Sequence, residues 1–185
     1  YGDWSSDVCS SDLPLLVSAL TDSGAVVRAE AAAALSRHPD PRIGPAVRPL
    51  LKDDNANVRA AAAWALAHNA GKDDLRELLP LCTDDPSGVV RFRAVWGLAF
   101  VRDKRGLPAA VAALGDYNPA VRERAALLAL EELADGTIGD RLLAQAGNEF
   151  TPTRRIVMYL FSRYGAAKQA GQDRKSTRLN SSHRT

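Results

Sequence analysis

The sequence is poor in aromatic and sulfur-containing residues, and it contains no long apolar run. Phe, Trp and Tyr make up 6% of the 185 residues, beside two cysteines and one methionine. No stretch approaches the roughly 18 consecutive apolar residues that a membrane-spanning helix needs, so we expect no membrane partner. The formal net charge of +2 gives no strong attraction to nucleic acid or to an anionic membrane surface.

What the sequence has instead is an alanine- and leucine-rich motif that recurs along the chain. Each copy is a Val-Arg pair followed by small and apolar residues, and the copies start 31 or 32 residues apart. A fixed period of this length is the signature of a repeat array. The copies are Val27–Leu35, Val58–Leu66, Val90–Leu98, Val121–Ala129 and a degenerate fifth, Thr153–Phe161.

Each copy predicts one helix with a buried face. If the Val is position 0, positions 0, 4, 7 and 8 share a face at about 100° per residue. These positions carry Val, small residues and mostly Leu. The small residues at positions 4 and 7 predict that a neighbouring helix approaches closely. Three positions before the Val stands a residue that suits a helix N-cap, namely Gly24, Asn55, Ser87 or Asn118.

A second apolar stretch precedes each copy, and several of these stretches contain or begin beside a proline, which starts or kinks a helix. No alternating β pattern of useful length is present. The predicted fold is therefore all-α, a right-handed α-α superhelical solenoid of about five helix pairs between about residues 14 and 165, with contacts between nearest neighbours. The preceding stretches are Leu15–Leu20, Ile43–Leu51, Leu75–Cys82, Leu107–Leu114 and Ile138–Ala146.

The two ends of the chain do not share the composition of the repeats. Asp3–Leu13 and Asp173–His183 resemble translations of the two strands of one short-read sequencing adapter. We therefore expect residues 1–13 and 173–185 to be adapter-derived, residues 166–172 to be a polar tail, and the genuine sequence to be a fragment. Cys9 falls in the first segment, which leaves Cys82 as the one native thiol and excludes an intrachain disulfide.

An aspartate five positions before the Val and the arginine after it recur in four copies. With the period, these residues resemble HEAT repeats, in particular the short HEAT-like repeats of phycobilisome lyase-type proteins, over about residues 14–165. The resemblance implies a charged ladder between successive repeats; the fifth copy departs from it, with Asn148 in the aspartate position. The ladder residues are Asp22, Arg28, Asp53, Arg59, Asp85, Arg91, Asp116 and Arg122.

We expect each ladder carboxylate to accept hydrogen bonds from backbone N–H groups and from the guanidinium of the next repeat. As exposed ion pairs these would contribute about 0–1 kcal/mol each, and would set geometry more than stability.

No residue pattern supports catalysis, a cofactor or a metal site. His38 and His68 do not occupy equivalent positions, and neither is followed by Glu, unlike the His-Glu pairs of the HEAT-repeat enzyme deoxyhypusine hydroxylase. We interpret both as solvated helix ends and Cys82 as a small buried hydrophobic residue. Phosphate-binding glycine motifs, nucleophile elbows and zinc-ligand spacings are missing from the sequence. We predict a non-enzyme without a cofactor.

The best candidate for a binding site lies at positions 2 and 6 of the Val-Arg helices, well away from the buried face. Two interpretations are open: a stripe on the concave surface of the solenoid that binds a partner, or rings that pack between adjacent repeats. The predicted partner-binding residues are Trp64, Phe92, Trp96 and Tyr159, with Arg93 and Arg155 beside them.

Three functions are compatible with these features. The leading hypothesis is a non-catalytic scaffold that binds a protein or peptide partner on its concave surface. The resemblance implies an alternative, a phycobilin lyase-like or chaperone-like subunit. A third is a HEAT-like nucleic-acid-binding module, which the near-neutral charge disfavours. Its possible basic patch would comprise Arg93, Arg124, Arg154 and Arg155.

Overall fold

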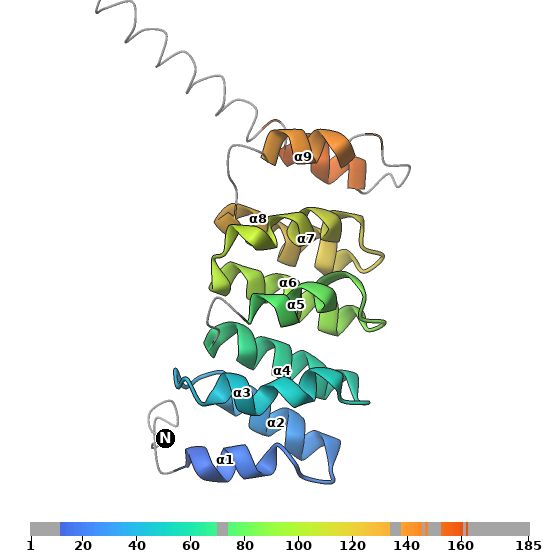
Figure 1. The fold of residues 1–185 in the computed structure, drawn as a ribbon. Coiled ribbons are helices and arrows are strands. Elements are labelled where there is room, and N and C mark those ends of the chain that lie inside the picture. Colours follow the sequence, from blue (N-terminus) through green and yellow to red (C-terminus); the bar gives the residue numbers. More distant parts are fainter. Residues whose placement is uncertain are drawn as a thin grey trace, which may run out of the picture. The chain divides into compact units, whose positions relative to one another are not determined.

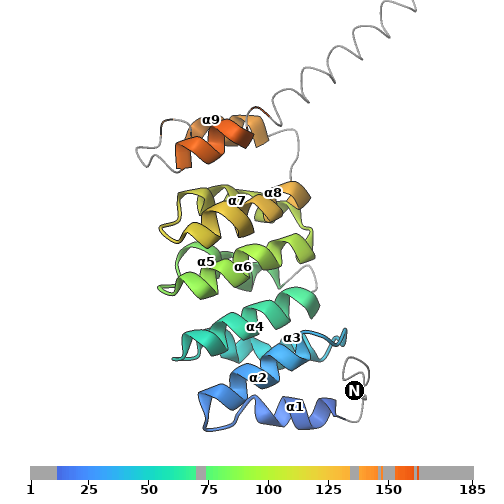
Figure 2. The same cartoon turned by 180° about the vertical axis from the view of Figure 1, so that it is seen from behind.

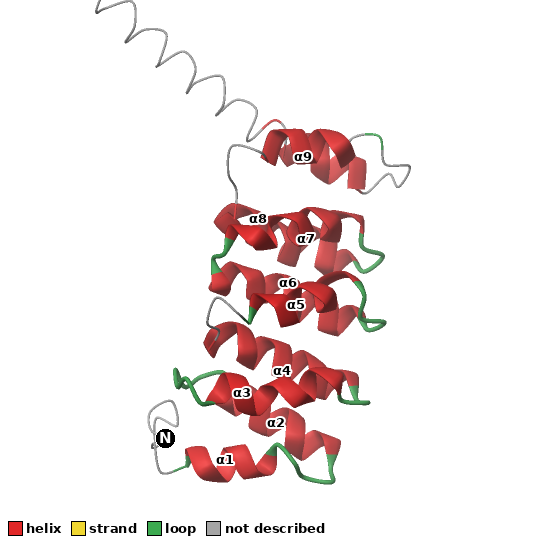
Figure 3. Ribbon diagram, in the orientation of Figure 1, coloured by secondary structure: helices red, strands yellow, loops and turns green. Residues whose placement is uncertain are grey.

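The computed structural model describes residues 12–69, 74–133, 138–145, 147, 153–160 and 162. The chain divides into two compact units, Tyr1–Leu133 and Ala134–Thr185. Within the described residues every regular element is a helix and none is a strand (Figure 3). The predicted all-α solenoid class is therefore confirmed. The predicted adapter-derived ends and polar tail lie outside the described residues except for Asp12 and Leu13.

Unit Tyr1–Leu133 is a stack of four helix pairs in two layers, seen from opposite sides in Figures 1 and 2. The A layer comprises α1 (Leu13–Ala19), α3 (Ile43–Val47) with the 3₁₀ turn η1 (Arg48–Lys52), α5 (Leu75–Thr83), and α7 (Leu107–Ala112) between the 3₁₀ turns η2 (Lys104–Gly106) and η3 (Ala113–Gly115). The B layer comprises α2 (Ala25–Leu35), α4 (Ala56–Asn69), α6 (Gly88–Val101), and α8 (Ala126–Leu133), which the π-helical turn η4 (Val121–Ala125) precedes.

Proline shapes the helices of the A layer. Pro14 and Pro108 lie in the first turns of α1 and α7, where a missing N–H breaks no hydrogen bond. Pro49 lies in the first turn of η1, the point where α3 ends. Pro80 lies inside α5. The predicted link between these prolines and the starts and breaks of helices is therefore confirmed at several sites.

The buried face predicted for the B-layer helices is confirmed at position 0 in three repeats, but at position 7 of the fourth copy the prediction is wrong, because Leu128 is 37% exposed. Val58, Val90 and Val121 at position 0 are fully buried. Val27 is the exception with 44% exposure, because no helix pair among the described residues packs on that side of the first repeat. Leucines at position 8 complete the apolar face, and the buried ones are Leu35, Leu66 and Leu98.

Small residues bring adjacent B-layer helices close together, as predicted. A Cβ atom built on Gly97, at position 7 of α6, would lie 2.7 Å from the Cβ of Ala67 in α4. This is inside van der Waals contact, so glycine lets the two helices approach. The helices of unit Tyr1–Leu133 that contact each other extensively belong to the same or adjacent repeats, as expected for a solenoid.

Unit Ala134–Thr185 contains α9 (Ile138–Gln145) and a helical segment at residues 153–160. Leu142 of α9 is buried, and so are Val157 and Leu160. These two segments correspond to the predicted fifth helix pair.

We predict that Gly97→Ala destabilises the protein, because overpacking costs about 1–3 kcal/mol and exceeds the gain of about 0.5–1 kcal/mol from replacing a helical glycine. Urea unfolding measures the change. In an Ala67→Gly background the same substitution should become neutral or stabilising, since the clashing Cβ is gone. Gly44→Ala is the control, because a Cβ built on Gly44 would lie 3.6 Å from its nearest neighbouring atom, which is ordinary contact. A loss of unfolding free energy equal to that of Gly97→Ala would contradict this explanation.

Candidate functional site

Each B-layer helix begins at a turn held by the aspartate and arginine of its own repeat. The aspartate Oδ1 accepts the N–H of the residue two positions later at 2.7–2.8 Å in all four repeats, from Asp22 to Asp116. The arginine Nη1 donates to the carbonyl oxygen of the same aspartate at 2.6–2.8 Å. These bonds satisfy polar groups just before each helix starts. Asn55 and Asn118 also accept a backbone N–H through Oδ1, as their capping role predicts.

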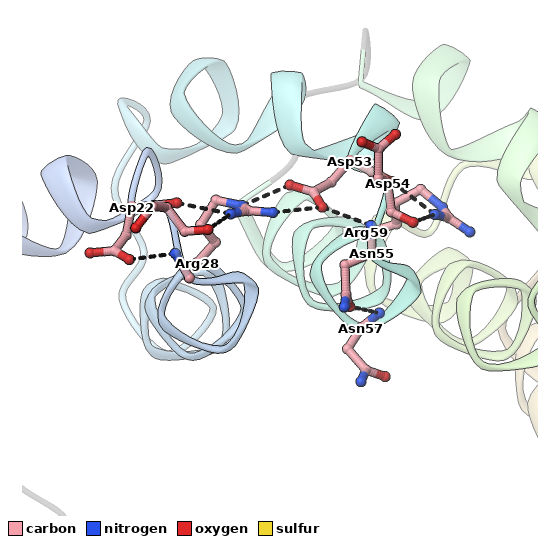
Figure 4. Close-up of polar contacts among 9 residues, drawn as sticks. Asp22, Arg28, Asp53, Asp54, Asn55, Asn57 and Arg59 are labelled. Carbon is pink, nitrogen blue, oxygen red and sulfur yellow. Dashed lines mark hydrogen bonds and ion pairs between the residues drawn. The ribbon is translucent and has the colours of Figure 1, made fainter.

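The same arginines join each repeat to the next. Arg28 donates through Nε and Nη2 to both carboxylate oxygens of Asp53, at 2.8 and 3.0 Å (Figure 4). Such two-point pairs fix orientation as well as distance. The equivalent contacts are Arg59 to Asp85 at 2.8 and 3.0 Å and Arg91 to Asp116 at 2.6 and 3.0 Å.

The ladder is present, but its direction is the reverse of the expected one. Each carboxylate accepts the guanidinium of the preceding repeat, not that of the next. The pairs are also largely buried rather than exposed. The aspartate side chains are 4–9% exposed and the arginine side chains 13–18%. The estimate for exposed pairs therefore does not apply, and breaking one of these pairs should affect stability.

The ladder environment keeps its aspartates ionised. Hydrogen bonds from Arg28 are the main cause that lowers the pKa of Asp53. For Asp85 and Asp116, burial is the largest single influence and acts to raise the pKa. The hydrogen bonds from the arginine and a backbone N–H, together with nearby arginine charges, outweigh it, so the pKa of both groups is lowered.

We predict that Asp85→Asn destabilises the protein by about 2–4 kcal/mol, because it removes the carboxylate that the mostly buried Arg59 bonds at two points. Asn keeps an oxygen that can accept the N–H of Ser87, so the turn itself is preserved. The matched control is Asp22→Asn, which keeps the turn bond and removes no arginine contact among the described residues. It should change unfolding free energy by less than about 0.5 kcal/mol. Equal losses in urea unfolding would show that the turn, not the ion pair, matters.

The ladder also predicts a pH dependence of stability. Because the folded-state pKa of Asp85 lies below its unfolded value of about 3.9, ionised Asp85 stabilises the fold above that pH. The contribution is lost as the pH falls through the folded pKa. The difference in unfolding free energy between wild type and Asp85→Asn should be constant above about pH 5 and shrink towards pH 2–3. A difference that stays constant across this range would contradict the assignment.

A group of rings occupies the B layer where α4 and α6 pack. We define the aromatic cluster as Trp64, His68, Phe92, Trp96 and Phe100. The Trp64 and Trp96 ring centroids are 4.8 Å apart, and the His68 ring lies 4.3 Å from Trp64 and 4.1 Å from Phe100. Phe92 lies 5.4 Å from Trp96. These separations are those of stacked and edge-on aromatic pairs.

The aromatic cluster both packs between repeats and reaches solvent. Trp64, Phe92 and Trp96 are half-buried, while Phe100 is 47% exposed. The Arg93 guanidinium is half-buried and lies 5.0 Å from the Trp64 ring and 5.9 Å from the Trp96 ring, in cation–π contact. The tryptophan rings therefore pack between adjacent repeats, as one of the two interpretations predicts, and part of their surface remains accessible to solvent. Binding of a partner here stays a prediction.

A hollow of about 540 Å³ opens beside this cluster, between α6 and α8. At its edge Arg102 follows the C-terminus of α6 in the left-handed region, with φ of 51°. Glycine usually occupies such a position, so the arginine there is strained. The residues that line the hollow are Trp96, Ala99, Phe100, Arg102, Leu128 and Glu131.

Two residues of the cluster were missed in the sequence. His68 is not a solvated helix end, because its ring contacts those of Trp64 and Phe100 and its Nδ1 lies 2.9 Å from the Trp64 carbonyl oxygen. Phe100 was not recognised as a candidate. The signal that would have found both is their spacing, since each lies four residues after a tryptophan and therefore on the same helical face.

The remaining predicted residues are distributed as follows. Tyr159 and Arg155 are exposed and belong to unit Ala134–Thr185, so their place in the same stripe stays a prediction. Arg154 is also exposed, and the side chain of Arg124 lies outside the described residues. Cys82 is fully buried, as predicted, and its Sγ donates to the Leu78 carbonyl oxygen. Burial raises the pKa of the Cys82 thiol to about 12.

Among the described residues, no group of three or more His, Cys, Asp or Glu side chains is placed to hold a metal ion. No helix in the same part of the chain has the length and apolar character to cross a membrane.

Comparisons with known proteins agree with this architecture. The sequence matches the family described as HEAT repeats over residues 13–99 and 75–159. A search of curated proteins finds no match. The fold is similar to that in the complex of CpcE and CpcF of phycocyanin lyase from Nostoc sp. PCC7120, with 20% identity, a TM-score of 0.59, and coverage of 82% of this chain and 98% of that one. It is also similar to an engineered protein, with 18% identity, a TM-score of 0.53, and coverage of 79% and 76%.

Proposed function

The chain belongs to the HEAT-repeat family, and from this premise we propose that it is a non-catalytic scaffold for protein interactions. Its aromatic cluster binds an apolar side chain of a protein or peptide partner, and the adjoining hollow receives that side chain. The single observation that carries the proposal is the exposed ring of Phe100, which belongs to the aromatic cluster and also lines the hollow.

The chemistry of this surface suits a protein partner. Aromatic and arginine side chains are enriched at the centres of interfaces, where they bury area with little loss of conformational freedom. Trp96 and Phe100 contribute to both the ring contacts and the hollow wall. Arg93 brings a positive charge to the tryptophan faces, so a partner with an acidic residue beside its apolar anchor is favoured.

The two alternatives have weaker support. A phycobilin lyase-like or chaperone-like role rests on similarity of fold at 20% identity, and fold does not imply function. Binding of nucleic acid needs several arginines that face phosphates. Arg28, Arg59 and Arg91 are instead held in the ladder by aspartates.

We predict that Phe100→Ala weakens binding of a partner peptide at least tenfold, equivalent to about 1.4 kcal/mol. The peptide is selected from a displayed library against the immobilised full-length protein. Because Phe100 is 47% exposed, its truncation should leave the melting temperature close to that of wild type. Truncation of Trp64 or Trp96 is less informative, since their half-buried rings join two repeats.

Tyr117→Ala is the matched control, because Tyr117 is 90% exposed and is not a member of the cluster. It should bind the same peptide as wild type does. The proposal fails if both truncations weaken binding equally or if neither does. Titration with a free bilin, followed by absorption, tests the lyase-like alternative in parallel. A spectral shift that Phe100→Ala abolishes would favour that alternative.

A further inference from the structure

The fourth B-layer helix is shifted by one residue relative to the three before it. In the first three repeats a fully buried leucine lies eight positions after the Val, at Leu35, Leu66 and Leu98. In the fourth repeat the fully buried leucine is Leu130, nine positions after Val121. The π-helical turn η4 accommodates the extra residue, because its hydrogen bonds close on the fifth residue rather than the fourth. Both ends of the apolar face therefore remain buried.

The shift places Leu128 where the two preceding helices have a tryptophan. After η4, each residue of α8 takes the place of the residue one position earlier in α4 and α6. Leu128, at position 7, then corresponds to Trp64 and Trp96 at position 6. Its exposure agrees with this equivalence. Leu128 is 37% exposed and lines the hollow, whereas Gly97, at position 7 of α6, is buried against Ala67.

The hollow lies where a third ring would continue the row of tryptophans. The Trp64 and Trp96 rings contact each other across adjacent repeats, with centroids 4.8 Å apart. The next helix in the layer is α8 (Figure 2), and at the equivalent place it has a leucine, which is smaller than tryptophan. Trp96 and Leu128 both line the hollow of about 540 Å³. The hollow is thus bounded by the last ring of the row and by the side chain that replaces the next one.

The opening of the hollow does not depend on where the sequence begins or ends. It lies between α6 and α8, two helices of successive repeats inside the array. A further repeat at either end of a solenoid stacks on the terminal unit, so it would not cover this surface.

We propose that the hollow binds an aromatic side chain of the partner, which contacts Trp96 as Trp96 contacts Trp64. The inference rests on the proposed function and names the chemical class of the anchor. Paired aromatic rings contribute more than the area that they bury, so the site should discriminate a ring from an aliphatic side chain. The Arg93 guanidinium lies over both tryptophan rings, and no carboxylate among the described residues pairs with it. An acidic residue next to the aromatic anchor is therefore complementary.

Leu128→Trp tests the site by filling it from within the protein. The introduced ring should occupy the hollow and weaken binding of the library-selected peptide about tenfold. The thermal unfolding midpoint should stay at or above the wild-type value, because the ring gains the contact with Trp96. Leu127→Trp is the matched control, since Leu127 is half-buried and is the position 6 residue of an unshifted helix. It should leave binding unchanged; blocking by Leu127→Trp rather than by Leu128→Trp would overturn the inference.

The anchor provides a second measurement, made on the wild-type protein. The selected peptide is synthesised with Trp, Phe, Leu or Ala at its anchor position, and the affinities are compared by fluorescence polarisation. The aromatic anchors should bind about tenfold more tightly than the leucine anchor, and Leu128→Trp should abolish this preference. If leucine binds as tightly as the aromatic anchors while Phe100→Ala still weakens binding, the inference is wrong and the scaffold proposal stands. If Phe100→Ala has no effect on binding, the proposed function fails, and the inference fails with it.

The register shift is tested without any ligand by removing the extra residue. Glu123 is exposed and lies in η4. Its deletion should convert η4 to an ordinary α-helical turn while Val121 and Leu130 stay buried, so the urea unfolding midpoint should remain close to that of wild type. Deletion of Ala60, at the equivalent position of α4, should lower the midpoint strongly, because it moves Leu66 out of the buried face. Equal losses from the two deletions would overturn the shift and the equivalence of Leu128 with the tryptophans.

Discussion

The two-point ion pair between the arginine of one repeat and the aspartate of the next is the contact on which the arrangement depends. One guanidinium bonds the carbonyl at the start of its own helix and both carboxylate oxygens of the following turn. That carboxylate in turn bonds an N–H at the start of the next helix. The starts of successive B-layer helices in unit Tyr1–Leu133 are thus linked, and the same interaction sets the stacking geometry and satisfies the polar groups at the helix starts.

Because successive B-layer helices start from equivalent, linked turns, equivalent side chains meet across repeats. Trp64 and Trp96 occupy the same position in successive helices, and their rings touch because both helices start from turns held in the same way. The close approach at Gly97 and Ala67 brings the two helices near enough for that contact. The ladder also occupies most of the B-layer arginines. Arg93 is left over the aromatic surface, which therefore has a modest rather than a strongly positive charge.

The period and the residue types at positions 0 and 8 were sufficient to predict the helix pairs and their buried face, because burial follows directly from helical spacing. The direction of the ladder did not follow. Spacing shows that an arginine recurs six positions after each aspartate, as Arg28 follows Asp22. It does not show whether the arginine side chain reaches the aspartate of the preceding or of the following repeat. Two backbone features had no sequence signal. Arg102 adopts a left-handed conformation in which glycine is usually found, and Val121–Ala125 forms a π-helical turn where the pattern predicts an ordinary α-helix. His68 was wrongly interpreted as a solvated helix end, because its spacing from Trp64 was not considered and its ring contacts those of Trp64 and Phe100.

In a repeat array every internal unit takes part in two equivalent interfaces. Here it donates from its arginine to the following repeat and accepts at its aspartate from the preceding one. Identical residue types then have different environments that depend only on their neighbours, as the exposure of Val27 against the burial of Val58 shows. The same argument applies to the aromatic cluster. It lies where α4 and α6 pack, so two adjacent repeats are required to bring its rings together.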